Sequence, residues 1–241
     1  MKFTVLRSLL FFCYAPAAFG SLVLSSTVAV SGTGFGTVAT LLSIQAQSIE
    51  TGCVSPTNIG DAFVQGAPGI CTGTGADVKT GASQTQVQPL SAGGVTSAAN
   101  FAIVFNANQS AGGPITITNL QVTFYTPSGG FLYQTSGFSC PGVPSCDFLN
   151  SQSGTGSSGF PFNLDATQQS QATAAGVFTN TANLVGIAAS FSNSNGGAET
   201  LYLTTFVPAP TGVPEPRSFV LALSGALLLF GGLAWKRRSR A

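Results

Sequence analysis

Large apolar residues alternate with small or polar ones along several stretches of this chain. Phe101, Ile103 and Phe105 fall on one side of an extended backbone. The segment 185–191 repeats the period, with an aliphatic or aromatic side chain at every odd position. A period of two is typical of a strand that buries one face, so this feature predicts a fold built from β-sheets.

Further strands are expected where Val, Ile, Leu and Thr gather. Two such runs are 22–30 and 38–47, and a third is 199–207. The glycine pair at 196–197 is expected to turn the chain back into this last run and so to form a C-terminal hairpin.

The alternation changes phase inside one predicted strand. Ile115 and Ile117 have odd parity, whereas Leu120 and Val122 have even parity. One extra residue near Asn119 restores a common inward face, so a β-bulge is predicted there.

One short helix interrupts the strands. Asp165 and Gln168 have the spacing of a capping box, which predicts a helix from 166 to about 175. The domain that contains these elements, 21–207, has about 190 residues, enough for one hydrophobic core. Strands at this spacing with a single short helix predict an all-β fold, an antiparallel β-sandwich or jelly roll.

The C-terminal end has three parts in a fixed order. A Pro/Gly linker at 208–212 leads to a short motif, an uncharged apolar run at 218–235 and a basic cluster. The motif consists of Val213, Pro214, Glu215 and Pro216, and the cluster contains Lys236, Arg237, Arg238 and Arg240. The 18 residues of the apolar run would form a helix roughly 27 Å long, close to the ~30 Å core of a bilayer. This helix is expected to cross the membrane, with the basic cluster on the cytoplasmic side.

The N-terminal end predicts export. Lys2 and Arg7 precede an apolar stretch, and Ala18 and Gly20 give the small-residue cleavage pattern of a secretory signal peptide. Residues 1–20 are therefore expected to be removed. The mature chain then begins at Ser21, outside the cytoplasm.

The order Val-Pro-Glu-Pro, one apolar helix and a terminal Arg-rich cluster resembles the PEP-CTERM sorting signal. The match covers 213–241, about an eighth of the chain. The resemblance implies a Gram-negative bacterium, a precursor held in the inner membrane with a periplasmic ectodomain, and processing by an exosortase. Release or transfer to the cell surface or matrix follows. Carriers of this signal are often producers of extracellular polysaccharide, which is therefore a candidate partner, and the same segment occurs on some ice-binding proteins.

The exported part carries almost no positive charge. Between Ser21 and Gly212, Lys79 is the one basic residue against six acids, which leaves a net charge near −5. A surface with a single Lys and no Arg cannot collect phosphates, which argues against nucleic acid as a partner. Charged residues make up 6% of the whole chain, so Ser, Thr, Asn, Gln and Gly must solvate the surface.

Four cysteines remain after the signal peptide: Cys53, Cys71, Cys140 and Cys146. An even number in an exported chain indicates disulfides, with three possible pairings. Proximity in the sequence favours Cys53 with Cys71 and Cys140 with Cys146. A zinc site is disfavoured because the chain has neither a Cys-x-x-Cys pair nor a histidine.

Missing residue types limit the chemistry. Without histidine there is no Ser-His-Asp or Cys-His pair, and the Gly-rich segments lack the setting of a nucleotide site, so no cofactor is predicted. Asp147, Asp165 and Glu199 remain as candidates for a two-carboxylate glycosidase. The alternative assigns Asp165 to helix capping and Glu199 to the rim of a hairpin. Asp61 and Asp77 form no calcium loop, so no metal and no catalytic residue are predicted.

Three functions from different classes follow. The leading hypothesis is a non-enzymatic exported surface or extracellular-matrix protein, because both ends carry targeting signals and catalytic groups are lacking. The second is a glycan- or ice-binding β-domain, suggested by the Thr, Ser and Asn content. The third is a cryptic glycosidase.

Overall fold

The computed structural model describes residues 21–26, 38–63, 71–81, 83–109, 113–149 and 159–207. The chain divides after Val207 into two compact units, and all described residues belong to the first. The predicted signal peptide, sorting motif, membrane span and basic cluster lie outside the described residues. Within the described part, no helix has the length and apolar character needed to cross a bilayer.

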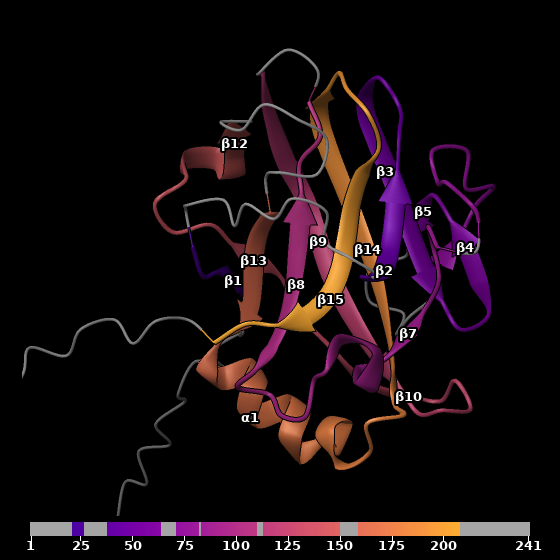
Figure 1. The fold of residues 1–241 in the computed structure, drawn as a ribbon, viewed down its shortest axis with the longest axis vertical. Helices are drawn as coiled ribbons and strands as arrows, with labels where there is room; N and C mark the ends of the chain where they lie inside the picture. The colour runs from indigo at the N-terminus through magenta and orange to yellow at the C-terminus, as the bar shows by residue number, and fades with distance from the viewer. Residues whose placement is uncertain are drawn as a thin grey trace, which may run out of the picture. The chain divides into compact units, whose positions relative to one another are not determined.

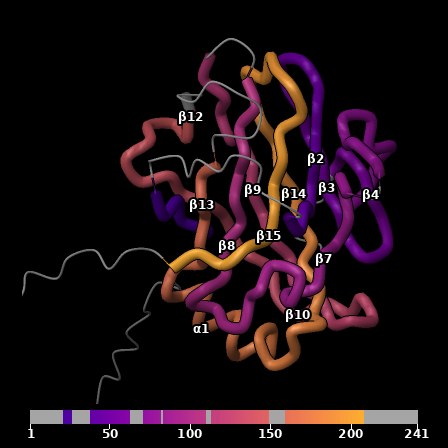
Figure 2. The backbone as a smooth tube through the Cα atoms, viewed as in Figure 1, coloured from indigo at the N-terminus to yellow at the C-terminus, as the bar shows by residue number. Residues whose placement is uncertain are grey.

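Six strands form the first sheet (Figures 1 and 2). Their order is β11 (Phe138–Ser139), β1 (Leu22–Leu24), β13 (Gly159–Leu164), β8 (Phe101–Asn106), β15 (Glu199–Thr205) and β2 (Ala39–Ile44). Neighbouring strands are antiparallel, except that β1 and β11 run parallel. The short strand β1 lies between β11 and β13.

Seven strands form the second sheet. Its main path runs through β10 (Phe131–Gln134), β9 (Pro114–Tyr125), β14 (Leu184–Ser194), β3 (Ser48–Ser55) and β4 (Asn58–Gly60). Off this path, β12 (Asp147–Leu149) pairs with β9, and β7 (Gln88–Pro89) pairs with β14. A separate ribbon consists of β5 (Ala62–Phe63) and β6 (Cys71–Thr72). The strand β14 is central, because β9 and β3 pair with it on opposite sides.

The predicted helix is confirmed as α1 (Ala166–Ala174), and with it a mostly β fold that has one α-helix in the described residues. Asp165 caps α1, since its Oδ1 accepts a hydrogen bond from the backbone N–H of Gln168 at 2.8 Å. Figure 1 shows α1 across the end of the sheets opposite the β2–β3 and β14–β15 turns. Three short 3-10 helices are η1 (Leu90–Gly93), η2 (Pro144–Cys146) and η3 (Val177–Thr179).

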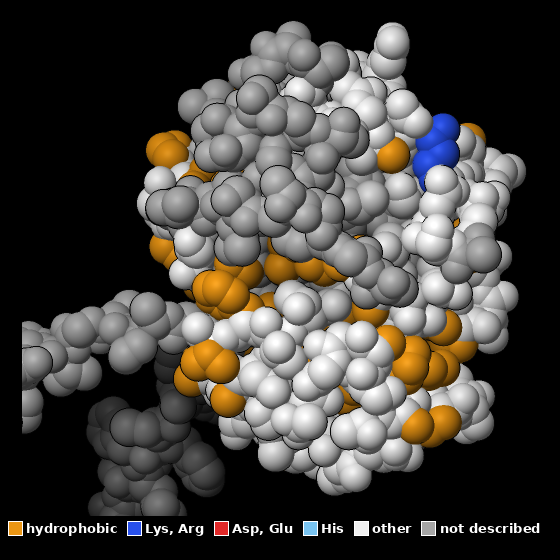
Figure 3. Space-filling model, viewed as in Figure 1, with side chains coloured by type: hydrophobic (Ala, Val, Ile, Leu, Met, Phe, Trp, Pro, Cys, Tyr) orange, Lys and Arg blue, Asp and Glu red, His pale blue; other side chains and the backbone are white. Residues whose placement is uncertain are grey.

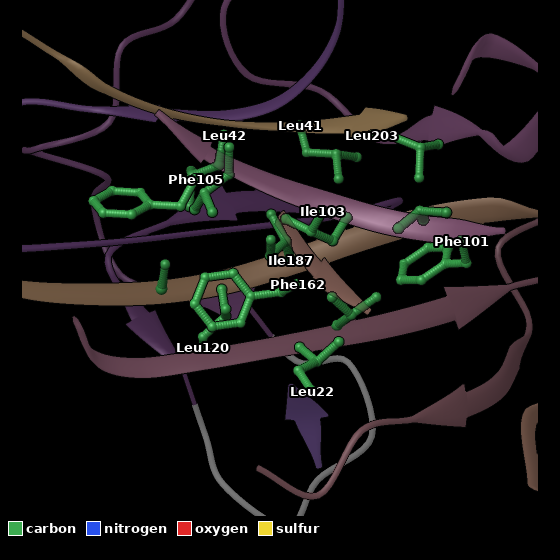
Figure 4. Close-up of a cluster of buried hydrophobic side chains, with 14 of the residues drawn as sticks. Leu22, Leu41, Leu42, Phe101, Ile103, Phe105, Leu120, Phe162, Ile187 and Leu203 are labelled. Atoms are coloured by element: carbon green, nitrogen blue, oxygen red, sulfur yellow. The ribbon is translucent and has the colours of Figure 1, made fainter. Parts of the chain in front are cut away.

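The two sheets share one apolar core (Figure 4). Phe105 of β8 stacks on Phe191 of β14, with ring centroids 4.7 Å apart. Phe101 of β8 meets Phe124 of β9 edge-on at 5.1 Å. Both contacts join the six-stranded to the seven-stranded sheet, and aromatic pairs of this kind contribute about 0.5–1.5 kcal/mol beyond the burial of their surface.

The inward face predicted for 101–106 is confirmed, but the strand is more buried than expected. Phe101, Ile103 and Phe105 are all fully buried. The alternation predicts that the opposite face is exposed, yet Ala102 and Val104 are 0% and 4% exposed. This prediction is wrong: β8 lies between β13 and β15, and the residues on both of its faces are buried.

The predicted bulge is also confirmed. Along β9, the pairing with β14 passes from Ile117 to Asn119, so Thr118 is the extra residue. Ile117 and Leu120, on either side of this irregularity, are both buried. The bulge therefore restores the inward face, as the change of parity requires.

The predicted C-terminal hairpin is wrong. The strands β14 and β15 are consecutive in sequence, yet they belong to different sheets. The partners of β15 are β2 and β8, and the consecutive strands β2 and β3 are divided between the sheets in the same way. Each of these strands buries an apolar face against the opposite layer, so the turn between them crosses from one layer to the other.

Both disulfides have the pairing that proximity favours. Cys53–Cys71 spans a sequence separation of 18, and Cys140–Cys146 spans 6. Cys53 and Cys71 form a small buried cluster with Ala188, apart from the main core. Two disulfides indicate an oxidising, extracytoplasmic environment.

Removing each disulfide should lower stability by a different amount. Chain entropy gives roughly 3 kcal/mol for the Cys53–Cys71 loop and about 1 kcal/mol less for the Cys140–Cys146 loop. The measurement is urea unfolding of the two double variants, Cys53→Ala with Cys71→Ala and Cys140→Ala with Cys146→Ala, beside the wild type. A larger loss for the second variant would contradict this ranking.

Candidate functional site

The structure separates the three carboxylates of the glycosidase hypothesis. Asp165 directly follows the C-terminal end of β13, whereas the register through β8 places Glu199 beside its N-terminal end. The six residues of β13 span roughly 20 Å, well beyond the ~5–10 Å that separates a glycosidase pair. Asp147 lies exposed on β12 in the other sheet, where it accepts a hydrogen bond from the Thr116 hydroxyl.

Glu199 instead meets Glu50 of β3, a carboxyl that the sequence pattern did not single out. Glu50 is 0% exposed and Glu199 is 1% exposed. The backbone N–H of Ala46 donates to Glu50 Oε2 at 2.9 Å, and the side-chain amide of Gln109 donates to Glu199 Oε1 at 2.6 Å. We refer to Glu50, Glu199 and Gln109 as the carboxyl cluster.

The carboxyl cluster joins three segments that are far apart in the sequence: the start of β3, the segment after β8 and the start of β15. Gln109 extends the contacts, because its Oε1 accepts a hydrogen bond from the backbone N–H of Asn195 at 2.9 Å. The Ser194 hydroxyl also donates to the Ala46 carbonyl at 3.2 Å. The cluster therefore fastens the β2–β3 turn to the β14–β15 turn at one end of the sandwich.

One oxygen of each carboxyl, Glu50 Oε1 and Glu199 Oε2, has no donor among the described groups. Two ionised carboxylates can only accept hydrogen bonds, yet the two side chains are within hydrogen-bonding range of each other. Burial, and after it the Glu199 carboxyl, raises the pKa of Glu50 to about 9, and burial also raises the pKa of Glu199. Asp77 adds a further negative charge that raises the pKa of Glu50. At neutral pH Glu50 therefore keeps a proton, which it shares with Glu199 as the donor between the two carboxyl groups.

Each acid of the described domain accepts a hydrogen bond from an uncharged donor. Backbone N–H groups donate to Glu50, Asp61, Asp77 and Asp165, a hydroxyl donates to Asp147 and an amide to Glu199. At Asp61, the N–H of Ala76 lowers the pKa of the carboxyl group.

Within the described residues, no group of three or more His, Cys, Asp or Glu side chains is placed to hold a metal ion.

Where described residues are visible in Figure 3, the face carries one basic side chain and no acidic one. The grooves on the described surface include the following two. One has a volume of about 470 Å³, and its lining is part apolar and part polar: Val54, Pro56, Ile59 and Val87, with Ser55, Thr57, Asn58 and Gln86. The other, of about 630 Å³, runs beside α1 and contains Gln169, Ser170 and Thr173. Neither groove is lined by a charged residue.

Comparison with known proteins gives no assignment. No family model matches the chain, and no curated protein and no solved structure matches it either. Among the residues singled out in the sequence, the structure locates the four disulfide cysteines and the three candidate carboxylates. Val213 to Pro216 and the basic residues after 235 lie outside the described part.

The shared proton predicts a pH-dependent stability. Glu50 titrates at about 9 in the folded state and near 4.5 when it is unperturbed, so between these values the folded chain keeps a proton that the unfolded chain releases. The contribution of this pair to the free energy of unfolding is therefore fully present below pH 4.5. It decreases as pH rises towards 9, by up to about 1.4 kcal/mol per pH unit. Urea unfolding between pH 5 and pH 8 measures this slope.

Glutamine variants test the proton directly. In Glu50→Gln the amide oxygen keeps the bond from Ala46 and the amide nitrogen donates to Glu199, so the variant should match the wild type at pH 5, exceed it at pH 8 and show a smaller slope. The double variant with Glu199→Gln places two amide nitrogens against each other and should be less stable than Glu50→Gln by about 1–3 kcal/mol. Asp147→Asn is the exposed control and should leave the slope unchanged. An unchanged slope in Glu50→Gln would rule out a shared proton.

Proposed function

We propose that this chain is an exported, non-enzymatic surface or extracellular-matrix protein of a Gram-negative bacterium. A signal peptide at 1–20 exports it, and the PEP-CTERM signal at 213–241 holds the precursor in the inner membrane until an exosortase processes it. The observation that carries this proposal is the order of the C-terminal parts: Pro-Glu-Pro, an uncharged run of 18 residues and a basic end.

Features of the described domain support an extracytoplasmic role. Its four cysteines are paired in two disulfides, which suits an oxidising compartment. Its acids are occupied by uncharged hydrogen-bond donors, and Glu50 and Glu199 are buried, so neither of these two offers an oxygen to a substrate. The proposed role therefore depends on the stability and surface of the domain.

Pro214→Ala tests the sorting signal. Loss of the motif should leave the precursor in the inner membrane, because the exosortase no longer recognises it. The measurement is the distribution of the protein between inner membrane and medium in the native host, by fractionation and intact mass. Pro208→Ala, in the linker before the motif, is the matched control and should be released normally. Normal release of Pro214→Ala would remove the exosortase proposal.

A second candidate function is glycan binding, and the groove beside Thr57 favours it. Sugars offer hydroxyl groups and apolar C–H faces, and the lining of this groove combines hydroxyl and amide side chains with aliphatic ones. The composition of the groove therefore supports a glycan partner.

Thr57→Arg fills this groove and should weaken binding to the host's extracellular polysaccharide by at least about tenfold, a loss of roughly 1.4 kcal/mol. Affinity electrophoresis through a gel containing the polysaccharide measures the effect. Ser170→Arg places the same side chain at the exposed groove beside α1 and serves as the control. Equal retention of wild type and both variants would remove the assignment of the Thr57 groove.

A further inference from the structure

Ser21, the residue expected to begin the mature chain, is bound to Asp165 through its backbone. The Ser21 backbone N–H donates a hydrogen bond to Asp165 Oδ2. In return, the Asp165 N–H donates to the Ser21 carbonyl at 3.2 Å. The two residues are 144 positions apart in the sequence, so this reciprocal contact is tertiary.

The two carboxylate oxygens of Asp165 accept different hydrogen bonds. Its Oδ1 caps α1 through the N–H of Gln168, and its Oδ2 faces Ser21. In a complete capping box, the side chain at the Gln168 position returns to the N–H of the cap residue. Here the side-chain atoms of Gln168 make no such bond, and the Asp165 N–H goes to Ser21 instead. Ser21 thus occupies the position that the capping box would fill from within the helix.

The strand that follows Ser21 is part of the core. Leu22 is 0% exposed, and its N–H donates to the Gly137 carbonyl at 2.8 Å. The strand β1 lies between β13 and β11, and β11 joins the sheet through β1. Only Ser21 separates the expected cleavage bond from this strand.

We propose that the α-ammonium group of Ser21, created when the signal peptide is removed, binds the Asp165 carboxylate and anchors β1 in the sheet. The inference rests on the proposed export of the chain. Water adds to the Gly20 carbonyl carbon, and the bond between that carbon and the Ser21 nitrogen breaks. Gly20 leaves with a carboxylate, and the Ser21 nitrogen becomes an amine that takes up a proton.

Cleavage changes the donor that faces Asp165. Before the cut, the Ser21 nitrogen is an amide with one N–H. Afterwards it is an ammonium with three, and a hydrogen bond between two ionised groups is roughly twice as strong as a neutral one. The other described base cannot compete for Asp165, because the backbone of Lys79 pairs with Ser43 of β2, at the opposite edge of this sheet. The ammonium is therefore the cation available to this carboxylate.

The same geometry gives an order of events. A peptidase binds its substrate as an extended segment on both sides of the scissile bond, whereas the folded domain places Ser21 against Asp165 and buries Leu22. Cleavage therefore precedes the docking of β1. Docking then completes the six-stranded sheet and brings β11 with it.

The reactivity of the Ser21 amine tests the proposal in the protein released by the native host. In the released domain, 21–212, the amines are the α-amine of Ser21 and the side chain of Lys79, so Lys79 is an internal reference. Acetic anhydride at pH 7 should acylate the Ser21 amine roughly three- to fivefold more slowly, relative to Lys79, in the wild type than in Asp165→Asn. Asp165→Ser should match Asp165→Asn. Both replacements keep a helix-capping oxygen, so circular dichroism should show the same helix content.

The outcomes separate this proposal from the proposed function. A released protein that begins at Ser21 but shows equal relative acylation in wild type and both variants overturns the anchor and leaves export intact. A mature protein that begins elsewhere overturns the anchor as well, and retention of residues 1–20 contradicts export itself. If the variants do not fold, acetylation of the wild-type Ser21 amine is the alternative test. It should lower the thermal midpoint, and an unchanged midpoint overturns the anchor.

Discussion

The contact between the two apolar sheet faces is the interaction on which the rest of this domain depends. Phe105 and Phe191 stack across the layers, and Phe148 and Phe160 extend this aromatic contact. The connections β2–β3 and β14–β15 each pass from one sheet to the other, so neither pair is held together by hydrogen bonds between consecutive strands. Their relative position depends on the core between the sheets, and on the carboxyl cluster at the end where both turns lie.

Periodicity made the strands and their inward faces predictable, because burial of a sheet face depends on local spacing. The bulge at Thr118 and the cap at Asp165 were predictable for the same reason, since each follows from residues a few positions apart. The pairing between strands distant in the sequence was not predictable. Nothing in 184–207 indicates that β15 leaves the sheet of β14, because both strands have the same apolar alternation and only the tertiary partner differs.

The carboxyl cluster could not be predicted from the sequence for a related reason. Glu50 and Glu199 are separated by nearly the whole domain, and each is a single acid in a polar stretch. The close approach of β3 to β2 beside Glu50 depends on a residue without a side chain: a Cβ on Gly52 would lie 2.4 Å from the Ile44 side chain. Such a position is visible only once β2 and β3 face each other across the layers.

The scarcity of bases shapes how this domain uses its acids. A carboxylate that lacks a Lys or Arg partner is stabilised by N–H and O–H donors or by a shared proton, and the described acids show both solutions. These bonds are short-ranged and are screened by salt much less than exposed ion pairs. The stability of the domain should therefore depend little on ionic strength, which suits the proposed export of the protein.

Both ends of the domain meet at one buried side chain, Asn163 of β13. The Ser25 hydroxyl, just after β1, donates to Asn163 Oδ1, and Asn163 Nδ2 donates to the carbonyl of Phe206, just after β15, at 2.8 Å. Asn163 is 5% exposed, so an unpaired amide there would be costly. The two segments that lead to the proposed processing sites are thus fastened to the same strand. The proposed cleavage before Ser21, and a cut after the linker at 208–212, would both leave this connection in place, because Ser25, Asn163 and Phe206 all lie between them.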